Sequence, residues 1–81
     1  MTEGLTKTQA DVYNAIVYYT NQNGFPPTIT DLCEMVNKSI GAIQSSLRIM
    51  KRKGFISMET YKPRTIRILK WLKNKKIYGI M

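Results

Sequence analysis

The fold is decided by residues 24–56, which read GFPPTITDLCEMVNKSIGAIQSSLRIMKRKGFI. The pattern predicts a helix over residues 29–36, a tight turn, a second helix from residue 39 to residue 52 or 53, and then a strand. One side of the second helix is apolar and carries Ile40, Ile43, Leu47 and Met50. The other side is small or polar and carries Gly41, Gln44, Ser45, Arg48 and Arg52. Such a helix can pack on a core while its other face enters a DNA major groove.

An earlier helix is expected over about residues 7–22, and capping chemistry marks its start. Thr6 and Gln9 have the spacing of a capping box, and Leu5 stands where a hydrophobic staple would. Residues at three- and four-residue spacing predict its buried stripe, namely Val12, Tyr13, Ile16, Val17 and Thr20. Asn23-Gly24 is a typical helix end.

The two later helices also have predicted caps. Thr28 and Asp31 form a second capping box for the helix over residues 29–36. The inner face of that helix is expected to hold Ile29, Leu32, Cys33 and Val36. Asn37-Lys38 is the predicted turn, and Ser39 is the predicted N-cap of the following helix.

Two strands are expected after the helices, because residues 55–58 and 65–69 alternate between apolar and polar side chains. One core face should hold their apolar residues, Ile56, Met58, Ile66 and Ile68. The loop over residues 59–64 contains a tyrosine, Lys62 and Arg64, which favours a wing on a phosphate backbone over an ordinary hairpin loop. The predicted fold is mainly α: a winged helix-turn-helix with three helices and a two- or three-stranded antiparallel wing.

Charge is distributed unevenly along the 81 residues, whose net charge is +8. Residues 1–37 hold one lysine and four carboxylates, a net charge of −3, whereas residues 38–81 hold twelve Lys or Arg and one Glu, a net charge of +11. This polarity indicates a surface for an anionic partner, with nucleic acid favoured over an anionic membrane. A basic surface that serves solubility alone is the alternative.

Several classes of protein are disfavoured. Cys33 is the only cysteine, so no internal disulfide can form, and an intracellular protein is expected. The start lacks a signal peptide, and no apolar stretch approaches the roughly 20 residues of a membrane span. Histidine is absent, and we expect no enzyme, no metal and no cofactor. Ser39, Ser45 and Ser46 are interpreted as cap and groove-facing hydroxyls.

Residues 1–69 are expected to form the one domain, followed by a basic, partly apolar tail over residues 70–81. The tail contains Trp71, Leu72, Ile77, Tyr78 and Ile80, which are too apolar for a solvated segment. It is expected to pack on the domain or on a second subunit. A homodimer would help so small a core.

Two motifs of residues 24–56 and several single positions are shared with a known family. The motifs are the entry Gly24-Phe25-Pro26-Pro27-Thr28 and the exit Arg52-Lys53-Gly54 with Phe55-Ile56 after it. The single positions are Leu5, Thr6, Gln9, Leu32, Val36, Ser39, Ala42 and Leu47. With these, residues 4–69 resemble the amino-terminal DNA-binding domain of the LexA repressors, a winged helix-turn-helix.

The resemblance implies where DNA is contacted. Bases would be read at Ser39, Gly41, Ala42, Gln44 and Ser45, and Arg48 is counted with them. Independently of the resemblance, the phosphate backbone is expected to be held by a helix N-cap and by cations, namely Thr28, Lys38, Lys51, Arg52, Lys62 and Arg64. Gly41 replaces an asparagine of the family, and Gln44 and Ser45 replace two glutamates, so a different operator is expected. Gln44 suits the N6/N7 edge of adenine, and Ala42 suits a thymine methyl group.

The resemblance also implies a self-cleaving peptidase half in the repressors, with an Ala-Gly cleavage bond. No Ala-Gly pair occurs in this chain, so autocleavage in cis is not expected, and any dimer would use other surfaces. The leading hypothesis is sequence-specific binding of double-stranded DNA by a small transcriptional regulator without autocleavage, which would be cytoplasmic, nucleoid-associated and of bacterial or phage type. Two alternatives are a winged-helix module that binds an acidic protein of the transcription machinery, and a DNA-binding accessory without sequence preference.

Overall fold

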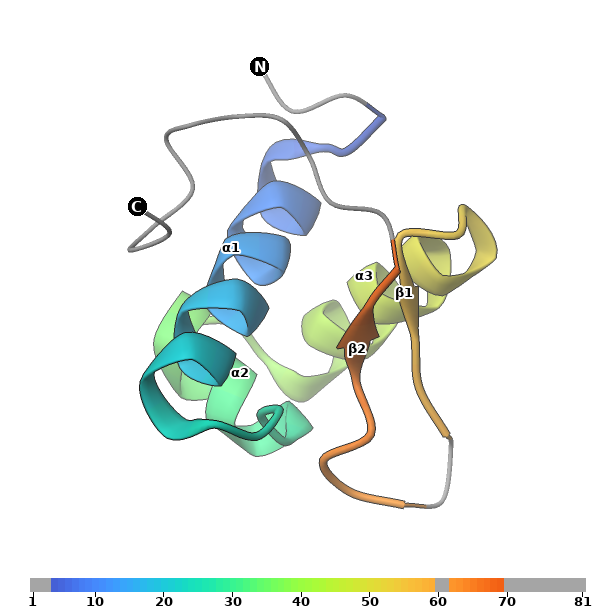
Figure 1. Ribbon diagram of the computed structural model, residues 1–81. Helices are drawn as coiled ribbons and strands as arrows, with labels where there is room; N and C mark the ends of the chain where they lie inside the picture. Colours follow the sequence, from blue (N-terminus) through green and yellow to red (C-terminus); the bar gives the residue numbers. More distant parts are fainter. Residues whose placement is uncertain (1–3, 60–61, 70–81) are drawn as a thin grey trace.

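The computed structural model describes residues 4–59 and 62–69, in which three helices precede a two-stranded antiparallel sheet (Figure 1). The helices are α1 (Lys7–Asn23), α2 (Ile29–Val36) and α3 (Ile40–Arg52), and the strands are β1 (Ile56–Ser57) and β2 (Arg67–Ile68). In the sheet, Ile56 stands opposite Ile68 and Ser57 stands opposite Arg67. This is the winged helix-turn-helix that the sequence predicts, with a wing of two strands.

Both predicted capping boxes are present. The Thr6 hydroxyl oxygen accepts from the Gln9 amide at 3.2 Å, and the Thr6 amide donates to Oε1 of Gln9 at 3.2 Å. At α2, the Thr28 hydroxyl oxygen accepts from the Asp31 amide at 3.1 Å, and the Thr28 amide donates to Oδ2 of Asp31 at 2.9 Å. Each box satisfies donors that the first turn of a helix leaves without an intrahelical partner.

The chain leaves α3 through Gly54, whose φ of 85° lies in the left-handed region that glycine adopts without strain. The Gly54 amide donates to the Lys51 carbonyl, and the Phe55 amide donates to the Met50 carbonyl, both at 3.0 Å. These two bonds form a Schellman motif. They turn the chain back so that Phe55 enters the core and β1 begins beside α3 (Figure 1).

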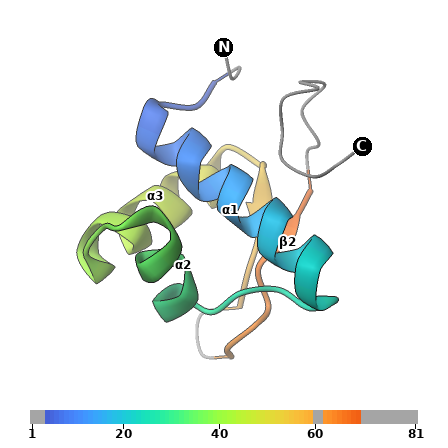
Figure 2. The ribbon, with the colours of Figure 1, turned by 90° about the vertical axis from the view of Figure 1, so that its left-hand side faces the viewer.

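One core holds these elements together, with α1 crossing over the other two helices (Figure 2). Its apolar residues come from all three helices and from the wing: Val12, Tyr13, Ala15, Ile16, Val17, Leu32, Ile43, Leu47, Met50, Phe55, Ile56 and Ile66. Met58 and Ile68 are partly buried against this core, on the face that the strand pattern predicts. No helix of residues 4–59 and 62–69 has the length and hydropathy needed to cross a bilayer.

Three details differ from the sequence prediction. Ile40 was expected on the core face of α3, but 55% of its surface is exposed, because it is the first residue of the helix and the core begins one turn later at Ile43. Thr20 is only partly buried, and so are three residues of the predicted inner face of α2, which nevertheless pack against the core: Ile29, Cys33 and Val36. The strands are shorter than predicted, with two residues in each.

Candidate nucleic-acid interface

The turn between α2 and α3 spans three residues. Asn37 adopts a left-handed conformation with a φ of 60°, and its amide donates to the Cys33 carbonyl at 2.9 Å. The Lys38 amide donates to the same carbonyl at 3.2 Å. The Ser39 hydroxyl oxygen then accepts from the Ala42 amide at 3.2 Å, which confirms Ser39 as the N-cap of α3. Asparagine tolerates the left-handed region, so the sequence can reverse the chain here without glycine.

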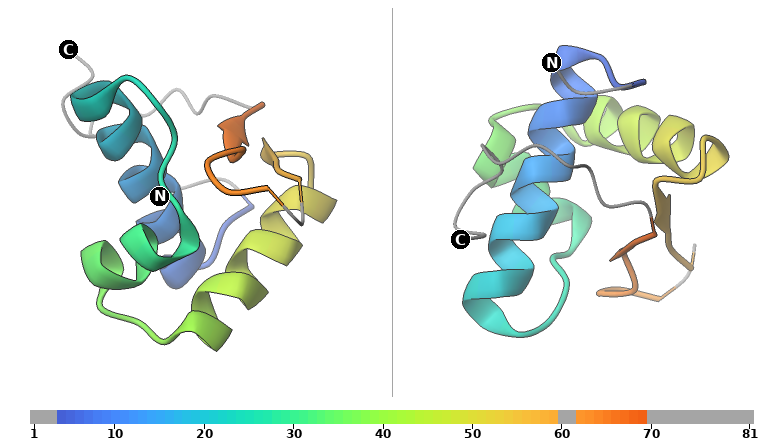
Figure 3. Two further views of the ribbon diagram at one scale, coloured as in Figure 1. Left: turned by 90° about the horizontal axis from the view of Figure 1, so that it is seen from below. Right: turned by 45° about the horizontal axis from the view of Figure 1, so that its top comes forward.

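Apart from Ile40, described above, the two faces of α3 are separated as predicted, with one exception. The buried face carries Ile43, Ser46, Leu47 and Met50. The exposed face carries Gly41, Gln44, Ser45, Arg48, Lys51 and Arg52. Ser46 is the exception: its hydroxyl was expected to face the groove, but the residue is buried because it falls between Ile43 and Met50 on the inner side. Figure 3 (left) shows α3 along the outer edge of the molecule, where its exposed face is accessible.

Two neighbouring residues at the start of α3 shape this exposed face. A methyl group added at Gly41 would meet no atom within 4 Å, so the backbone can approach a partner closely at this point. Ile40 lies one helical turn before Gln44, and Gln44 lies one turn before Arg48, so the three share a stripe. Sequence reasoning missed Ile40 because its three-residue spacing to Ile43 imitates a core position. Its place as the first helical residue was the available signal.

A hollow of about 270 Å³ lies between α3, the start of α2 and the beginning of the wing. Its lining combines apolar and polar side chains from these elements: Ile29, Gln44, Leu47, Arg48, Lys51 and Met58. Of the predicted DNA contacts, Gln44, Arg48 and Lys51 are thus brought together around one concave surface. A guanidinium and an ammonium group beside a groove-facing amide suit a nucleic-acid backbone and an adjacent base edge.

The wing loop carries an exposed lysine, Lys62, on a stretch of backbone that hydrogen bonds to the Thr65 hydroxyl hold together. Nζ of Lys62 lies 3.7 Å from Oε1 of Glu59, and 72% of the lysine side chain is exposed. The Thr65 hydroxyl oxygen accepts from the Glu59 amide at 2.9 Å and lies 3.1 Å from the Lys62 carbonyl oxygen. Exposed ion pairs of this kind contribute little to stability. Lys62 can therefore exchange its carboxylate partner for a phosphate.

Arg64 lies on the inner side of the same loop. Its Nη1 donates to the Tyr19 hydroxyl at 3.1 Å and to the Pro26 carbonyl at 3.0 Å, and it lies 3.4 Å from Oδ2 of Asp31. The guanidinium carbon also stands 4.7 Å from the centre of the Phe25 ring. A phosphate contact by Arg64 stays a prediction, while the structure shows this side chain engaged with α1, α2 and the segment between them.

The carboxylate of Asp31 is held in its ionised form. The backbone hydrogen bond from Thr28 is the main cause of a lowered pKa, and the Thr28 hydroxyl, the Tyr19 hydroxyl and the charge of Arg64 lower the pKa further. Partial burial acts in the opposite direction and is outweighed. A negative charge therefore persists at the start of α2 at neutral pH, where it faces the wing arginine.

The remaining predicted backbone contacts are dispersed. Lys38 is exposed in the turn, Arg52 is exposed at the end of α3, and Thr28 is half-buried with its hydroxyl oxygen used in the cap. Nζ of Lys53 donates to the Gly4 carbonyl at 2.6 Å, so this cation is directed toward the amino-terminal segment. The predicted contributions of residues 60–61 and 70–81 lie outside the described residues.

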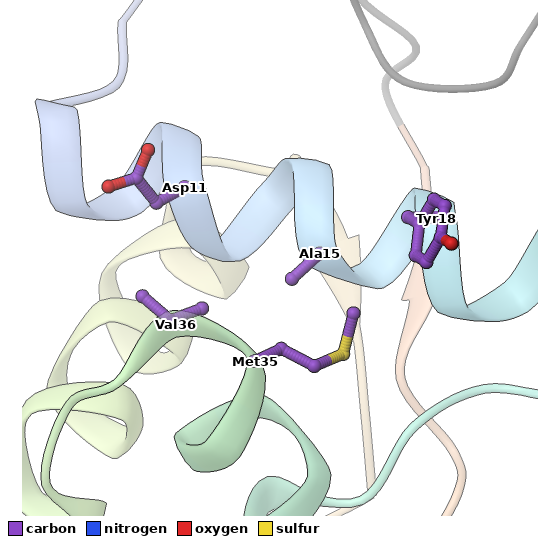
Figure 4. A pocket seen from close by; sticks show the side chains of 5 residues that line it. All are labelled: Asp11, Ala15, Tyr18, Met35 and Val36. Carbon is purple, nitrogen blue, oxygen red and sulfur yellow. The ribbon is translucent and has the colours of Figure 1, made fainter.

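A second hollow, of about 330 Å³, lies between α1 and α2 (Figure 4). Asp11, Ala15 and Tyr18 line it from α1, and Met35 and Val36 line it from α2. A carboxylate at one end and apolar side chains along the rest would not attract a phosphate, so we do not include this hollow in the nucleic-acid surface.

Within residues 4–59 and 62–69, no group of three or more His, Cys, Asp or Glu residues could hold a metal ion.

Comparison with known proteins agrees with this geometry. The family model described as the LexA DNA binding domain matches residues 2–65. The LexA repressor of Clostridium kluyveri (strain NBRC 12016) is 33% identical over 81 residues, which is 99% of this chain and 40% of that repressor. The LexA repressor of Desulfatibacillum aliphaticivorans is 38% identical over 69 residues, which is 84% of this chain and 34% of that repressor. The chain thus spans less than half the length of these curated relatives.

Proposed function

The chain belongs to the LexA DNA-binding domain family, and on that basis we propose that it reads duplex DNA in a sequence-specific manner as a small transcriptional regulator. The observation that carries the proposal is the division of α3 into a buried, mostly apolar face and an exposed face that is open at Gly41. That exposed face is capped, rigid and bordered by cations, as a helix in a major groove requires.

In this proposal α3 enters the major groove with its amino-terminal half against the bases. The exposed Gln44 amide would bond the N6/N7 edge of an adenine. Ile40, one turn earlier on the same stripe, offers an apolar contact to a thymine methyl group, and half-buried Ala42 offers a smaller one. Ser39, Gly41 and Ser45 permit close approach, and the Arg48 side chain can reach a base from the carboxyl-terminal side.

Phosphates on either side of the groove would be held by cations of three elements. Lys38 belongs to the turn, Lys51 and Arg52 belong to the end of α3, and Lys62 belongs to the wing. Thr28 adds the amino-terminal end of α2, which favours a nearby anion. Contacts of this kind fix the register on the duplex and do not choose the sequence.

The proposal extends to parts that the structure does not describe. Residues 70–81 would form a basic, partly apolar extension of the domain that packs on it or on a second subunit. A dimer joined in this way would bind a two-fold symmetric operator. We place the protein in the cytoplasm at the nucleoid, without an enzymatic activity.

Selection from a random duplex library, with the full chain at about 150 mM salt, tests the proposal, because non-specific binding is already weak there. We expect enrichment of a short motif. An inverted repeat would indicate a dimer, and a single half-site would indicate a monomer. The Gln44→Ala variant, altered only at an exposed position, is the matched control and should enrich a different or weaker motif. Failure of the wild-type chain to enrich any sequence would contradict the proposal and favour a protein partner or non-specific binding.

A further inference from the structure

In addition to its apolar packing on the core, the wing is tied to the segment between α1 and α2 through the side chain of Arg64. Its hydrogen bonds reach Tyr19, 45 residues earlier in the chain, and Pro26, 38 residues earlier. Its guanidinium carbon stands 4.7 Å from the centre of the Phe25 ring and 5.8 Å from the centre of the Tyr19 ring. The two rings meet edge to face with their centres 6.0 Å apart. Arg64 thus occupies an aromatic and polar site at the junction of α1 and α2.

The backbone of Arg64 supports the same conclusion. Its φ is 57°, in the left-handed region that residues with a side chain seldom adopt. Such a conformation persists only where surrounding contacts hold it. Here the conformation accompanies a guanidinium that reaches α1 and α2, and the bonds to Tyr19 and Pro26 provide the compensation.

The Asp31 carboxylate connects this site to the helix-turn-helix. One oxygen, Oδ2, accepts from the Thr28 amide at 2.9 Å in the α2 cap and lies 3.4 Å from Nη1 of Arg64. The N-cap of α2 and the wing therefore share a single acceptor. A hollow beside this contact is lined by Thr28 and Ile29 from the start of α2 and by Lys62 and Arg64 from the wing. The position of the wing relative to α2 and α3 is consequently set at this point.

We infer that Arg64 is a positioning residue for DNA binding: it holds the wing against the α1–α2 junction so that Lys62 reaches a phosphate while α3 occupies the major groove. In this role Arg64 acts through the contacts of Nη1 with Tyr19, Pro26 and Asp31 and of its guanidinium with an aromatic ring, and it needs no phosphate contact of its own. This inference rests on the proposed function. In place of the direct contact between Arg64 and the DNA backbone that the sequence predicts, it gives Arg64 an indirect role that acts through Lys62.

A double-mutant cycle separates the two roles, since interacting positions give non-additive effects. The full-length wild type, Arg64→Gln, Lys62→Ala and the double variant would be titrated onto the selected duplex at several salt concentrations. Lys62→Ala should weaken binding and lower the salt slope by about one unit. Arg64→Gln should do the same, because the displaced wing loses the Lys62 contact. The double variant should then bind no more weakly than Arg64→Gln alone.

The alternatives give different results. If Arg64 binds a phosphate directly, the double variant loses about two units of salt slope and the two affinity losses multiply. If Arg64 serves stability alone, Lys62→Ala keeps its full effect in the Arg64→Gln background. Either result would overturn the inference. Arg64→Lys provides a further check: lysine can replace arginine at a phosphate but lacks the planar donor set used here, so we expect it to behave like Arg64→Gln.

A measurement without DNA keeps this inference separate from the proposed function. Nuclear Overhauser contacts between the Arg64 side chain and the Phe25 ring are expected in the isolated wild-type protein. Their absence would overturn the inference even if the protein binds DNA. Their presence, together with a failed duplex selection, would contradict the proposed function and the role of Arg64 in it, while the attachment of the wing would stand.

Discussion

The helix-turn-helix and the wing are held in place by different kinds of contact. In α2 and α3 the caps lie three residues from the groups they bind, as in the pairs Thr28–Asp31 and Ser39–Ala42. Beneath them, Leu32, Ile43 and Leu47 are fully buried in the core. The wing has strands of two residues, packs on the core through Ile56 and Ile66, and is also held by a side chain that reaches back to α1.

In the proposed complex, this difference separates the reading of DNA from its anchoring. The surface proposed to face the bases is built on the part of the molecule with the most local and most buried contacts. The cation that the wing presents depends on one long-range cluster around Arg64. Substitutions in the cluster should therefore change how tightly DNA is held, whereas substitutions on α3 should change which DNA is held.

The largest effect is expected from Leu47→Ala, which empties a fully buried position beneath α3. Deletions of this kind cost about 2–5 kcal/mol. Ile68→Ala in β2 is the matched control and should cost distinctly less, because Ile68 is only half-buried. Urea unfolding of both variants measures the contrast. Equal losses at the two positions would show that the wing contributes as much to the core as the helix-turn-helix does.

Gln44→Ala should remove discrimination at one adenine, at a cost of about 1–3 kcal/mol on the selected site, because a bidentate amide contact is lost. Replacing that adenine by 7-deazaadenine, which lacks N7, should weaken the wild type and leave the variant unaffected. Lys62→Ala should instead weaken every duplex alike. Binding titrations on selected and scrambled duplexes distinguish the reading surface from the anchoring one. A uniform loss for Gln44→Ala would argue against direct reading of bases.

Ser39→Ala should lower the free energy of unfolding by about 1 kcal/mol, because the Ala42 amide loses its cap. Ser39→Asp keeps an acceptor at this position and is the control. Since the cap is local, we expect the loss in chemical denaturation to appear without any change at the wing, as followed by amide shifts of residues 62–69. Shifts throughout the wing would show that the two regions are coupled more strongly than their contacts suggest.

Ile40→Ala should have little effect on stability, because the side chain is mostly exposed. On DNA, loss of an apolar contact should cost about 0.8 kcal/mol for each buried methylene removed. Replacing one thymine by uracil, which lacks the methyl group, should weaken the wild type but not the variant. Identical responses of the two proteins to every thymine replacement would remove Ile40 from the reading surface.

The smallest effect is expected at Asp31, where the two regions meet. Its pKa is lowered from 3.8, so its contribution to stability is present above about pH 4 and is lost as the pH falls through the folded-state value. Asp31→Asn should therefore be less stable than the wild type at pH 7, and the difference should narrow toward pH 3. Thermal unfolding of both proteins between pH 7 and pH 3 measures this difference in stability. Parallel pH profiles for the two proteins would show that the carboxylate does not link the cap to the wing.

The sequence predicted what depends on neighbouring residues. The caps at Thr6, Thr28 and Ser39 and the ends of all three helices follow from local patterns, and they lie within a residue or two of the predicted positions. Both strand segments were also found on the expected face, although they are short. The caps depend on contacts that span three residues, and the faces of the helices and strands follow from the spacing of apolar residues, which periodicity can detect.

What the sequence did not predict depends on contacts between distant segments. Periodicity placed Ile40 in the core, because an ideal helix wheel does not show where neighbouring helices stop. The Ser46 hydroxyl was assigned to the groove with the other serines, although its spacing from Ile43 and Met50 is that of the buried face. The partners of Arg64 are 33 or more residues away, and charge alone assigned this arginine to a phosphate. The contacts of Lys38, Lys51 and Lys62 with DNA remain predictions for the same reason.

Gly41 lies on the proposed base-reading surface at a position where the fold does not require glycine. Its backbone is helical, and a side chain added there would extend into open space. Because nothing in the core or the caps depends on it, a new residue at this position would alter operator choice without a compensating change elsewhere. Gly41 is therefore the position at which selection or design could retarget the protein in a single step.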